Sequence, residues 1–450
     1  MKIVIIGGGP AGMLAAIAAS KSNIYNVEKV KEPSQVILLE KNEKLGKKLF
    51  ITGKGRCNLT NDCERDEFFK NIVRNPKFLF SAFSAFSNKN LESFVEENGC
   101  KIKIERGNRV FPHSDKSYDV IDAFKNALKE AKVKIKLNTE VKSIAIKDDE
   151  FIITTNNEKI HADRVIIATG GMSYKSTGST GDGYKFAKSF DIDVVSQSPS
   201  LVPFNVKEVN ECKDMQGLTL KNIGIKIFDL NNTKKVIYDD FGELLFTHFG
   251  LSGPVILSAS CYLELPYDSD DELKHSGISN KIDSIVLSID LKPALSSEQL
   301  DQRLIRELEE NKNKQLKSVI ESLLPSSMVD VFIDRLNKGD KLPDSLKIRE
   351  LASIKNADVP KELRRSIVAL LKDFRYIIES KRGFNEAIIT RGGVDVKEIN
   401  PKTMESKKVS GLYFAGEVID IDAMTGGFNI QIASSTGYLA GQNAANNGLF

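Results

Sequence analysis

The spacing of hydrophobic positions changes along the chain and predicts different kinds of element. The segment KIVIIG (residues 2–7) contains a continuous β-branched run, typical of a strand buried on both faces of a parallel sheet. It is followed by MLAAIAASK (13–21), which is rich in helix formers. The buried-strand pattern returns in VILLEK (36–41), RVIIATGG (164–171) and GLYFAGEVID (411–420). These segments predict a Rossmann-like α/β domain whose sheet draws strands from both ends of the chain.

Shorter strands with alternating apolar and polar residues come before residue 164. VKIKL (133–137) is followed by EVKSIAIK (140–147), EFIITT (150–155), an Asn156-Asn157 turn and EKIHAD (158–163). Period-two alternation with a turn dipeptide predicts an antiparallel meander.

The middle of the chain follows two other patterns. Residues 199–290 hold several short strand-like runs, and 291–372 show apolar spacing near 3.6 with charged opposite faces, which predicts helices. The runs FRYIIES and NEAIIT then lead back towards the C-terminal strand. The expected domains are a discontinuous Rossmann-like domain (1–198 and 389–450), a β-barrel-like domain (199–290 and 373–388) and an α-helical insert (291–372).

Composition narrows the class of protein. With 450 residues, 41% hydrophobic residues and a net charge of +3, the chain is typical of a soluble multidomain protein, and its charge gives little support to nucleic-acid binding. Five cysteines without a C-x2-C pair argue against a disulfide framework or a zinc site and suit a reducing cytoplasm. No H-E-x-x-H or clustered Cys/His pattern suggests a metal. Glycines interrupt the apolar N-terminus, and no run reaches the ~18 apolar residues of a membrane span, so we expect neither export nor a membrane partner.

The segment GGGPAG carries the clearest chemical signal. Gly7, Gly9 and Gly12 form G-x-G-x-x-G, with Pro10 and Ala11 between them, directly after a strand and before a helix. This arrangement gives a tight turn, close backbone approach to a pyrophosphate, and a helix N-terminus aimed at the phosphates. Glu40, at the end of the second strand, is placed to accept hydrogen bonds from ribose hydroxyls. It lies 28 residues beyond Gly12, against a usual ~20, and an inserted polar loop at 22–34 accounts for the difference.

A second helix start is predicted near the C-terminus. The strand at 411–420 runs into Gly416-Glu417, and Gly426-Gly427 then opens a helix of small and apolar residues. One helix start suits a pyrophosphate. The other could face a ring carbonyl that gains negative charge on reduction.

These residues resemble a known family. GGGPAG, Glu40, ATGG, FAGE and TGGFN are similar to the two-dinucleotide-binding-domain flavoproteins, which bind FAD. The match is closer to the bacterial BaiN-type NAD(P)/FAD-dependent oxidoreductases, also called aminoacetone-oxidase-like. It rests on KLGKKLFITGKGRCNLTN, GSTGDGY, FTHFGLSGPVIL and TRGGVDVKEINPKTMESKKVSGLYFAGEVIDIDAMTGGFNIQ and covers essentially the whole chain.

The resemblance implies a set of FAD contacts. Gly9 to Gly12 would contact the pyrophosphate, and Glu40, Lys41 and Val141 the adenosine. Thr169 and Gly170 would end the strand beneath FAD, and Glu417, after Gly416, would bind the ribityl or pyrophosphate side. The segment Gly427, Phe428, Asn429 and Ile430, after Gly426, would lie at the isoalloxazine edge.

The glycine-rich stretch LGKKLFITGKGRCNLTN (45–61) is interpreted as a second strap of the FAD site. Lys47 or Lys48 could neutralise phosphate charge, and Gly53 permits close backbone approach. Arg56 and Asn58 could bond the cofactor near the isoalloxazine, with Cys57 as a small packing residue beside it. A solvated basic loop is the alternative. Cys57 and Cys63 lack the C-x4-C spacing of disulfide reductases, which argues against that activity.

Two residues are candidates for catalysis. His248, beside a glycine turn, could protonate a substrate carbanion or enolate, and Arg391 could hold an anionic substrate or stabilise reduced flavin. A structural histidine and a structural ion pair are the competing interpretations.

The expected function is an FAD-dependent oxidoreductase acting on a small organic substrate, by C=C reduction or amine oxidation. The sequence has no second G-x-G-x-x-G domain, so NAD(P)H would visit the flavin transiently. An FAD-dependent tRNA-modifying enzyme and a non-catalytic FAD sensor are the alternatives. The 291–372 helices mix acids and bases and contain few aromatics, so we expect no nucleic-acid partner.

Overall fold

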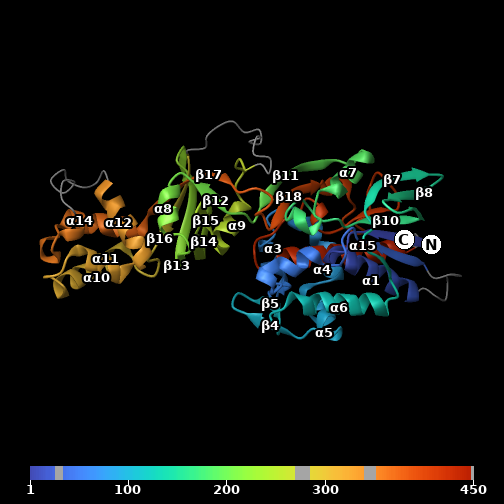
Figure 1. Cartoon of the computed structure of the whole chain (residues 1–450), viewed down its shortest axis with the longest axis horizontal. Helices are drawn as coiled ribbons and strands as arrows, with labels where there is room; N and C mark the ends of the chain where they lie inside the picture. Colours follow the sequence, from blue (N-terminus) through green and yellow to red (C-terminus); the bar gives the residue numbers. More distant parts are fainter. Residues whose placement is uncertain (26–33, 269–283, 339–350, 447–450) are drawn as a thin grey trace. The chain divides into compact units, whose positions relative to one another are not determined.

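The computed structural model describes residues 1–25, 34–268, 284–338 and 351–446 (Figure 1). The chain forms two compact units. Unit 1 comprises Met1–Leu201 and Gly383–Phe450, and unit 2 comprises Val202–Arg382.

A five-stranded parallel sheet lies at the centre of unit 1, and the Rossmann-like fold expected from the sequence is confirmed. The strand order is β19 (Leu412–Phe414), β10 (Arg164–Ile167), β1 (Lys2–Ile6), β2 (Gln35–Leu39) and β6 (Lys134–Lys136). Val4 pairs with Val165 on one side and with Ile37 on the other, so apolar side chains fill the centre of the sheet. The strand within 133–137 therefore extends this sheet, while the antiparallel meander contains only the three strands that follow it.

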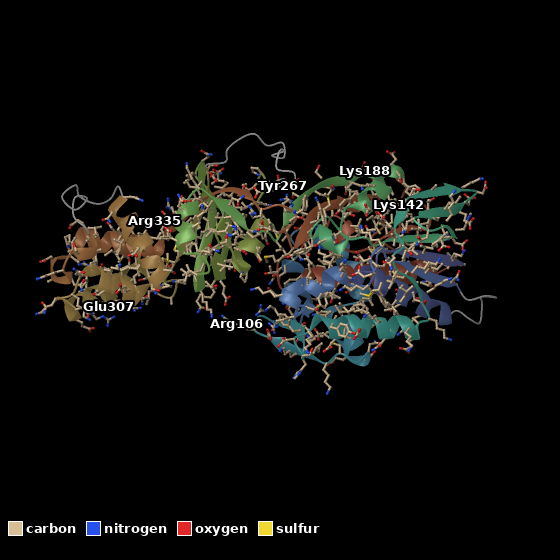
Figure 2. All side chains as sticks on the ribbon, viewed as in Figure 1. Arg106, Lys142, Lys188, Tyr267, Glu307 and Arg335 are labelled. Atoms are coloured by element: carbon tan, nitrogen blue, oxygen red, sulfur yellow. The ribbon has the colours of Figure 1, made fainter. Side chains whose placement is uncertain are left out.

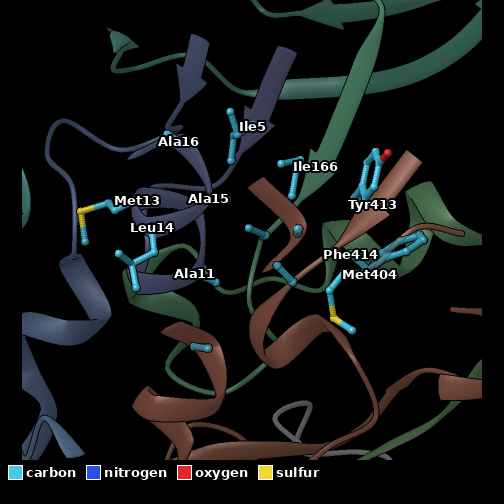
Figure 3. Packing of buried hydrophobic residues seen from close by; sticks show 14 of the residues in the cluster. Ile5, Ala11, Met13, Leu14, Ala15, Ala16, Ile166, Met404, Tyr413 and Phe414 are labelled. Carbon is cyan, nitrogen blue, oxygen red and sulfur yellow. The ribbon is translucent and has the colours of Figure 1, made fainter. Parts of the chain in front are cut away.

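Two helices pack directly against each other beside this sheet. Helix α1 (Pro10–Tyr25) supplies small buried side chains, among them Ala11 and Ala15, which belong to the same core cluster as Ile5 and Ile166 (Figure 3). Helix α15 (Phe428–Ala445) contacts α1 through Gly437 and Gly441. A Cβ atom on either glycine would lie 2.2 or 2.1 Å from the carbonyl oxygen of Ala11 or Ala15, so only glycine permits this contact. The sequence predicts a loop at 22–34. Its first residues, 22–25, instead continue helix α1 to Tyr25, and 26–33 lie outside the described residues.

Smaller elements surround the central sheet. The meander consists of β7 (Val141–Lys147), β8 (Glu150–Thr155) and β9 (Lys159–Ala162). A second small sheet contains β3 (Thr60–Asn61), β5 (Arg109–Pro112) and β4 (Ile102–Glu105). A two-stranded sheet pairs β11 (Val194–Ser200) with β18 (Ile389–Val394). The other helices of unit 1 are α2 (Lys47–Ile51), α3 (Arg65–Lys70), α4 (Phe80–Ala85), α5 (Asn88–Glu97), α6 (Ser117–Glu130) and α7 (Asp182–Ser189), with short 3-10 turns at η1 (Thr52–Gly55), η2 (Pro76–Leu79), η3 (Lys175–Thr177), η6 (Val396–Glu398) and η7 (Gly416–Val418).

Unit 2 contains a closed antiparallel barrel, as expected from the sequence. Its strand order is β12 (Phe204–Val206), β15 (Gly250–Ser252), β14 (Asn232–Phe246), β13 (Thr219–Asp229), β16 (Ile285–Asp290) and β17 (Phe374–Lys381). Along β17 every second side chain, Phe374, Tyr376 and Ile378, is fully buried. Its helices are α8 (Val209–Asp214), α9 (Pro254–Ser260), α10 (Ser297–Glu310), α11 (Leu316–Leu323), α12 (Ser326–Lys338) and α14 (Lys361–Lys372), with turns η4 (Leu351–Ser353) and η5 (Asn356–Asp358).

The barrel and the helices of unit 2 share one hydrophobic core. Phe332 of α12 stacks on Phe374 of the barrel with ring centroids 6.2 Å apart. Arg335, labelled in Figure 2, lies 4.0 Å above the Phe374 ring, and its Nε donates to Glu211 at 2.8 Å. The helical segment is therefore packed on the barrel and is not an independent body.

The chain enters and leaves unit 2 at adjacent points. The backbone N–H of Arg382 donates to the carbonyl oxygen of Pro203 at 3.0 Å, and Phe204 pairs with Lys381 across β12 and β17. None of the described helices is both long and apolar enough to cross a membrane.

Candidate functional site

A cavity in unit 1 opens at the carboxyl ends of β1, β2 and β10, where doubly wound folds bind their ligands. It brings together most of the residues singled out from the sequence: Gly7, Gly9, Pro10, Ala11, Glu40, Lys41, Lys47, Lys48, Gly53, Asn58, Val141, Thr169, Gly170, Glu417, Gly426, Gly427, Asn429 and Ile430. Gly12, Arg56, Cys57, Gly416, Phe428, His248 and Arg391 lie outside this lining.

The three glycines of the first motif have different structural roles. Gly7 has φ 112°, and a Cβ there would lie 2.4 Å from the carbonyl oxygen of Ala168. A Cβ on Gly12 would lie 1.9 Å from the carbonyl oxygen of Gly7. Gly9 lines the cavity, yet a Cβ there would meet no atom of the described residues within 4 Å. Gly7 and Gly12 therefore serve the protein's own packing, whereas Gly9 leaves room for a ligand at the start of α1.

Glu40 ties the end of β2 to the glycine turn. Its side chain is buried, Oε2 accepts from the Gly8 backbone N–H at 2.7 Å, and Oε1 accepts from the Asn42 backbone and side chain at 2.8 and 2.7 Å. Each carboxylate oxygen has two acceptor sites, so Oε2 can still accept a hydrogen bond from a hydroxyl in the cavity.

Lys41 reaches across the cavity to helix α7. Its Nζ lies 2.8 Å from Oδ2 of Asp182 and 2.6 Å from Oγ1 of Thr180. Burial acts to raise the pKa of Asp182, but hydrogen bonds from Lys41 and Thr180 outweigh it and leave the pKa below its usual value.

Lys48 is paired with Glu417 inside the cavity. Its Nζ lies 2.6 Å from Oε2 of Glu417 and donates to Ser173 Oγ at 2.7 Å. The other oxygen of Glu417 accepts from the Thr390 backbone N–H at 2.9 Å. The charge of Lys48 is thus balanced by a carboxylate, and Lys47 pairs with Glu43 at 3.3 Å.

The strap at 52–58 has an unusual backbone. Gly53, Lys54, Gly55 and Cys57 all have left-handed φ values, of 57°, 57°, 83° and 58°. Non-glycine residues rarely adopt this region. Burial raises the pKa of the Cys57 thiol to about 12, so it is a neutral packing group.

Arg56 is not among the lining residues, although the sequence suggested a contact with the cofactor. Its guanidinium pairs with Glu105 and Asp115 and lies 4.2 Å above the Phe111 ring. Hydrogen bonds from Arg56 lower the pKa of Glu105, and those from Lys103 and Arg56 lower that of Asp115. Two carboxylates and an aromatic ring hold this side chain, so Arg56 anchors the strap to the β4–β5 hairpin.

The other end of the cavity lies at the start of α15. Gly427 has φ 97°, and its N–H donates to Asn58 Oδ1 at 3.2 Å when the amide is oriented to satisfy both of its ends. The Asn429 side chain bonds both backbone groups of Ala423. The Phe428 ring packs 5.4 Å from Phe68, so the residue belongs to the core and its neighbours face the cavity.

Neither catalytic candidate is among the lining residues. Arg391, on β18, is buried, and its charge opposes the burial that raises the pKa of Asp422. His248 is exposed on the turn between β14 and β15 of unit 2, with its ring 5.0 Å from that of Phe249. The geometry thus favours a structural role for Arg391.

Sequence reasoning missed several parts of the lining, among them Ile421, Met424 and the wall opposite Lys41. Thr177, Gly178, Ser179 and Asp182 lie opposite Lys41 and Asn42. Three of them, Gly178, Ser179 and Asp182, belong to the motif GSTGDG, which has the wrong spacing for a dinucleotide fingerprint. Its small polar residues and its place in the family resemblance were the available signals.

The residues of the cavity fit a flavin dinucleotide. The cavity runs from Val141 and Glu40, past the open position at Gly9, to Asn58 and Gly427. It therefore offers two helix starts, each with N–H groups that lack intrahelical partners, and a buried acid between strands β1 and β2. This fold and this site define a Rossmann-type FAD-binding flavoprotein.

The chain belongs to the HI0933-like family, because the family model described as HI0933-like protein Rossmann domain matches residues 1–443. It is 29% identical over 444 residues to the 3-dehydro-bile acid delta(4,6)-reductase of Clostridium scindens, covering 99% of both chains. It is also 29% identical over 439 residues to the ribosomal RNA dihydrouridine synthase of Haemophilus influenzae, covering 97% of this chain and 96% of that one. The Escherichia coli protein of the same name is 28% identical over 442 residues, covering 98% and 97%. The expected family resemblance is confirmed, and the chain is a flavin-dependent oxidoreductase.

Proposed function

We propose that this chain reduces a carbon–carbon double bond conjugated to a carbonyl group, with NAD(P)H as the electron donor. The observation that carries the proposal is that one continuous cavity spans both helix starts of unit 1. FAD, when bound there, supplies the hydride chemistry. Because the sequence contains no second dinucleotide fingerprint, donor and acceptor would use the flavin in turn.

The names of the relatives point to one shared reaction. A delta(4,6)-reductase acting on a 3-dehydro bile acid saturates double bonds conjugated to a ketone. A dihydrouridine synthase saturates the ring double bond conjugated to a uracil carbonyl. Both reactions add a hydride to the carbon far from the carbonyl and a proton to the carbon next to it. We extend this shared chemistry to the present chain.

The residues of unit 1 would hold FAD by its two ends. The first turn of α1 would bind the pyrophosphate, Glu40 the adenosine ribose, and the backbone at Val141 the adenine. Glu417, fixed by Lys48, would accept a hydrogen bond from a ribityl hydroxyl. The start of α15 at Gly427, with Asn58, would face the ring edge and favour negative charge on the reduced ring.

An anaerobic experiment tests the reaction. The FAD-loaded protein is mixed with NADH or NADPH, and the flavin absorbance is followed. The reduced protein is then mixed with a 3-oxo-4-ene steroid, a uridine-containing RNA, or oxygen. We expect one nucleotide to bleach the flavin and a conjugated substrate to restore it faster than oxygen does. Failure of both nucleotides to bleach the flavin, or reoxidation by oxygen alone, would overturn the proposal.

His248 is proposed as the proton donor of the second half-reaction. Its support is its exposure on the β14–β15 turn and the capacity of an imidazole side chain to act as a general acid. His248→Gln should slow flavin reoxidation by the conjugated substrate and leave reduction by NAD(P)H unaffected. The matched control is His161→Gln, an exposed histidine of β9 bonded to Glu150. Equal reoxidation rates for His248→Gln and the wild type would remove this role.

An RNA uridine is a second candidate substrate. The earlier expectation of no nucleic-acid partner rests on the bulk charge and on the helices of 291–372. Those two features leave out the arginine and phenylalanine side chains at the surface of α3 and α4 in unit 1, which could contact RNA.

We also propose a cytoplasmic location, supported by five free, buried cysteines.

A further inference from the structure

An arginine lies over two phenylalanine rings at the surface of unit 1. Phe80, at the start of α4, is 43% exposed, and its ring packs edge-to-face on Phe69 of α3 at 4.8 Å. The Arg65 guanidinium lies 5.7 Å from the Phe69 centroid and 5.6 Å from the Phe80 centroid. These three residues are called the Arg65 face. A large exposed apolar ring with a cation held over it offers a stacking surface for a planar group.

Two further arginines lie beside this face. Arg106 and Arg109 are exposed on the β4–β5 hairpin, and Figure 2 shows Arg106 extending from it. The hairpin is joined to the segment before α3 by a hydrogen bond from the Asp62 N–H to the Asn108 carbonyl oxygen at 2.7 Å. Arg109 Nε donates to the Arg106 carbonyl oxygen at 3.0 Å, so the Arg109 side chain folds back onto the turn that carries Arg106, and its guanidinium lies 5.8 Å from the Phe111 centroid.

The acids near this surface limit its charge. Glu105 is paired with Arg56, Asp62 with Lys89, and Glu67 with Lys70. Glu64 and Asp66 are exposed on either side of Arg65 in the sequence. A surface of this mixed charge does not attract a duplex by bulk electrostatics. It suits a partner that supplies planar groups for stacking and a few phosphates for the arginines.

Aromatic contacts connect this face to the cavity. The Phe69 ring lies 5.8 Å from that of Phe68, and the Phe68 ring lies 5.4 Å from that of Phe428. Phe428 is the first residue of α15 and follows Gly427, which lines the cavity. The Phe69 ring of the Arg65 face is therefore two ring contacts away from Phe428, at the end of the cavity where the flavin ring is proposed to lie.

We propose that the Arg65 face holds the unpaired nucleotides next to a target uridine in a folded RNA. Neighbouring bases stack on Phe80 and Arg65, and Arg106 and Arg109 contact the phosphates, while the unstacked uridine enters the cavity. This inference rests on the second substrate named under the proposed function. A steroid carries no phosphates and gains nothing from the two hairpin arginines.

The test measures RNA binding by the FAD-loaded protein with a fluorescently labelled hairpin whose loop contains unpaired uridines. Phe80→Ala and Arg65→Ala should each weaken binding by about tenfold, in the range for loss of one stacked base. Arg106→Ala with Arg109→Ala should weaken it and reduce its salt dependence. The matched control is Phe241→Ala, because Phe241 is 53% exposed on β14 of unit 2. FAD content and thermal unfolding confirm that each variant is folded.

Three binding results would overturn this inference. They are no binding of the hairpin by the wild type, unchanged binding by Phe80→Ala and Arg65→Ala, or an equal loss in Phe241→Ala. A loss of steroid reduction by Phe80→Ala without any RNA binding would also overturn it and make the face a small-substrate contact. Each of these leaves the proposed function standing if a conjugated substrate still reoxidises the flavin. Failure of that reoxidation overturns the proposed function alone.

Discussion

At the scale of single residues, one motif contains glycines that are required for different reasons. Gly12 allows α1 to start against the carbonyl oxygen of Gly7, whereas Gly9 keeps space open in the cavity. The two positions look alike in the sequence, but only a substitution at Gly12 should lower the stability of the cofactor-free protein.

Gly9→Ala and Gly12→Ala separate these two reasons. Gly12→Ala should destabilise the protein by at least ~1–3 kcal/mol, because its Cβ overlaps backbone that cannot move independently. Gly9→Ala should leave the cofactor-free protein as stable as the wild type and weaken FAD binding about tenfold or more, equal to about 1.4 kcal/mol. Urea unfolding and fluorescence titration with FAD measure the two effects. Unchanged FAD affinity in Gly9→Ala would contradict this account of the cavity.

The cysteines provide a second test at this scale. All five are free and buried, and burial raises the pKa of Cys57 and Cys212 to about 12 and of Cys63 and Cys100 to about 11. A thiol reagent at pH 8 should therefore label none of them within minutes in the native protein, and all five in denaturant. Rapid labelling of Cys57 in the native protein would restore the redox interpretation of the strap.

Most motif residues, including Lys41, Lys47 and Lys48, could be placed at the cavity from the sequence, but the two arginines could not. Gly9, Glu40 and Asn58 line the cavity as expected, because their backbone position decides where they point. Arg56 and Arg391 were also singled out, but both lie outside the lining. An arginine can reach partners several ångströms away, and Glu105 and Asp115 come near Arg56 only after β4 and β5 have paired.

At the scale of elements, the segment after η7 forms one wall of the cavity. Ile421 and Met424 line the cavity, while Asp422 between them is fully buried on the other side. Oδ2 of Asp422 accepts from Ser200 Oγ at 3.0 Å, and Oδ1 lies 3.3 Å from Nε of Arg74. Burial raises the pKa of Asp422 to about 6, although Arg74, Ser200 and Arg391 oppose this change.

This raised pKa predicts a pH-dependent stability. The folded state holds its proton on Asp422 up to about pH 6, whereas the unfolded chain loses it near pH 4, so this residue's contribution to stability falls between those values. Asparagine does not titrate, so Asp422→Asn lacks this pH-dependent contribution. The unfolding free energy of the wild type minus that of the variant should therefore decrease from pH 4 to pH 6 and stay constant above pH 7. Urea unfolding of the FAD-free proteins measures it, and a difference independent of pH would contradict the assignment.

Hydrophobic periodicity predicted the types of these elements because burial decides them locally. The continuous run at 2–6 became a central parallel strand, and the alternating runs at 141–162 became the meander. The short strand β6 shows the limit of this reasoning. Its alternating sequence resembles the meander strands, but its pairing partner is β2, and only the tertiary structure selects that partner.

At the scale of the whole molecule, the lining of the cavity comes entirely from unit 1, although unit 2 interrupts the sequence of that unit. The chain ends of unit 2 are joined by the hydrogen bond from Arg382 to Pro203. A short linker could therefore replace unit 2 without stretching unit 1.

Replacing residues 203–382 with a short glycine-serine linker should give a folded protein that still binds FAD. We expect the flavin absorbance and stoichiometry of the full chain, because no lining residue of the described cavity is removed. Reduction of a conjugated substrate should be lost if His248 is the proton donor. Gel filtration and the flavin spectrum provide the measurements, and an FAD-free but folded product would show that the cofactor needs unit 2.

The backbone contact between α1 and α15 also sets a length. Ala11 and Ala15 touch Gly437 and Gly441 in the same order, so the two helices run parallel with a fixed stagger. Helix α1 starts at Pro10 and α15 at Phe428, so the start of α15 extends beyond that of α1 by about 12 Å at 1.5 Å per residue. The helix pair thus holds two helix N-termini at a fixed distance from each other. A flavin mononucleotide, which lacks the second phosphate and the adenosine, is too short to contact both N-termini. The protein should therefore bind it more weakly than FAD.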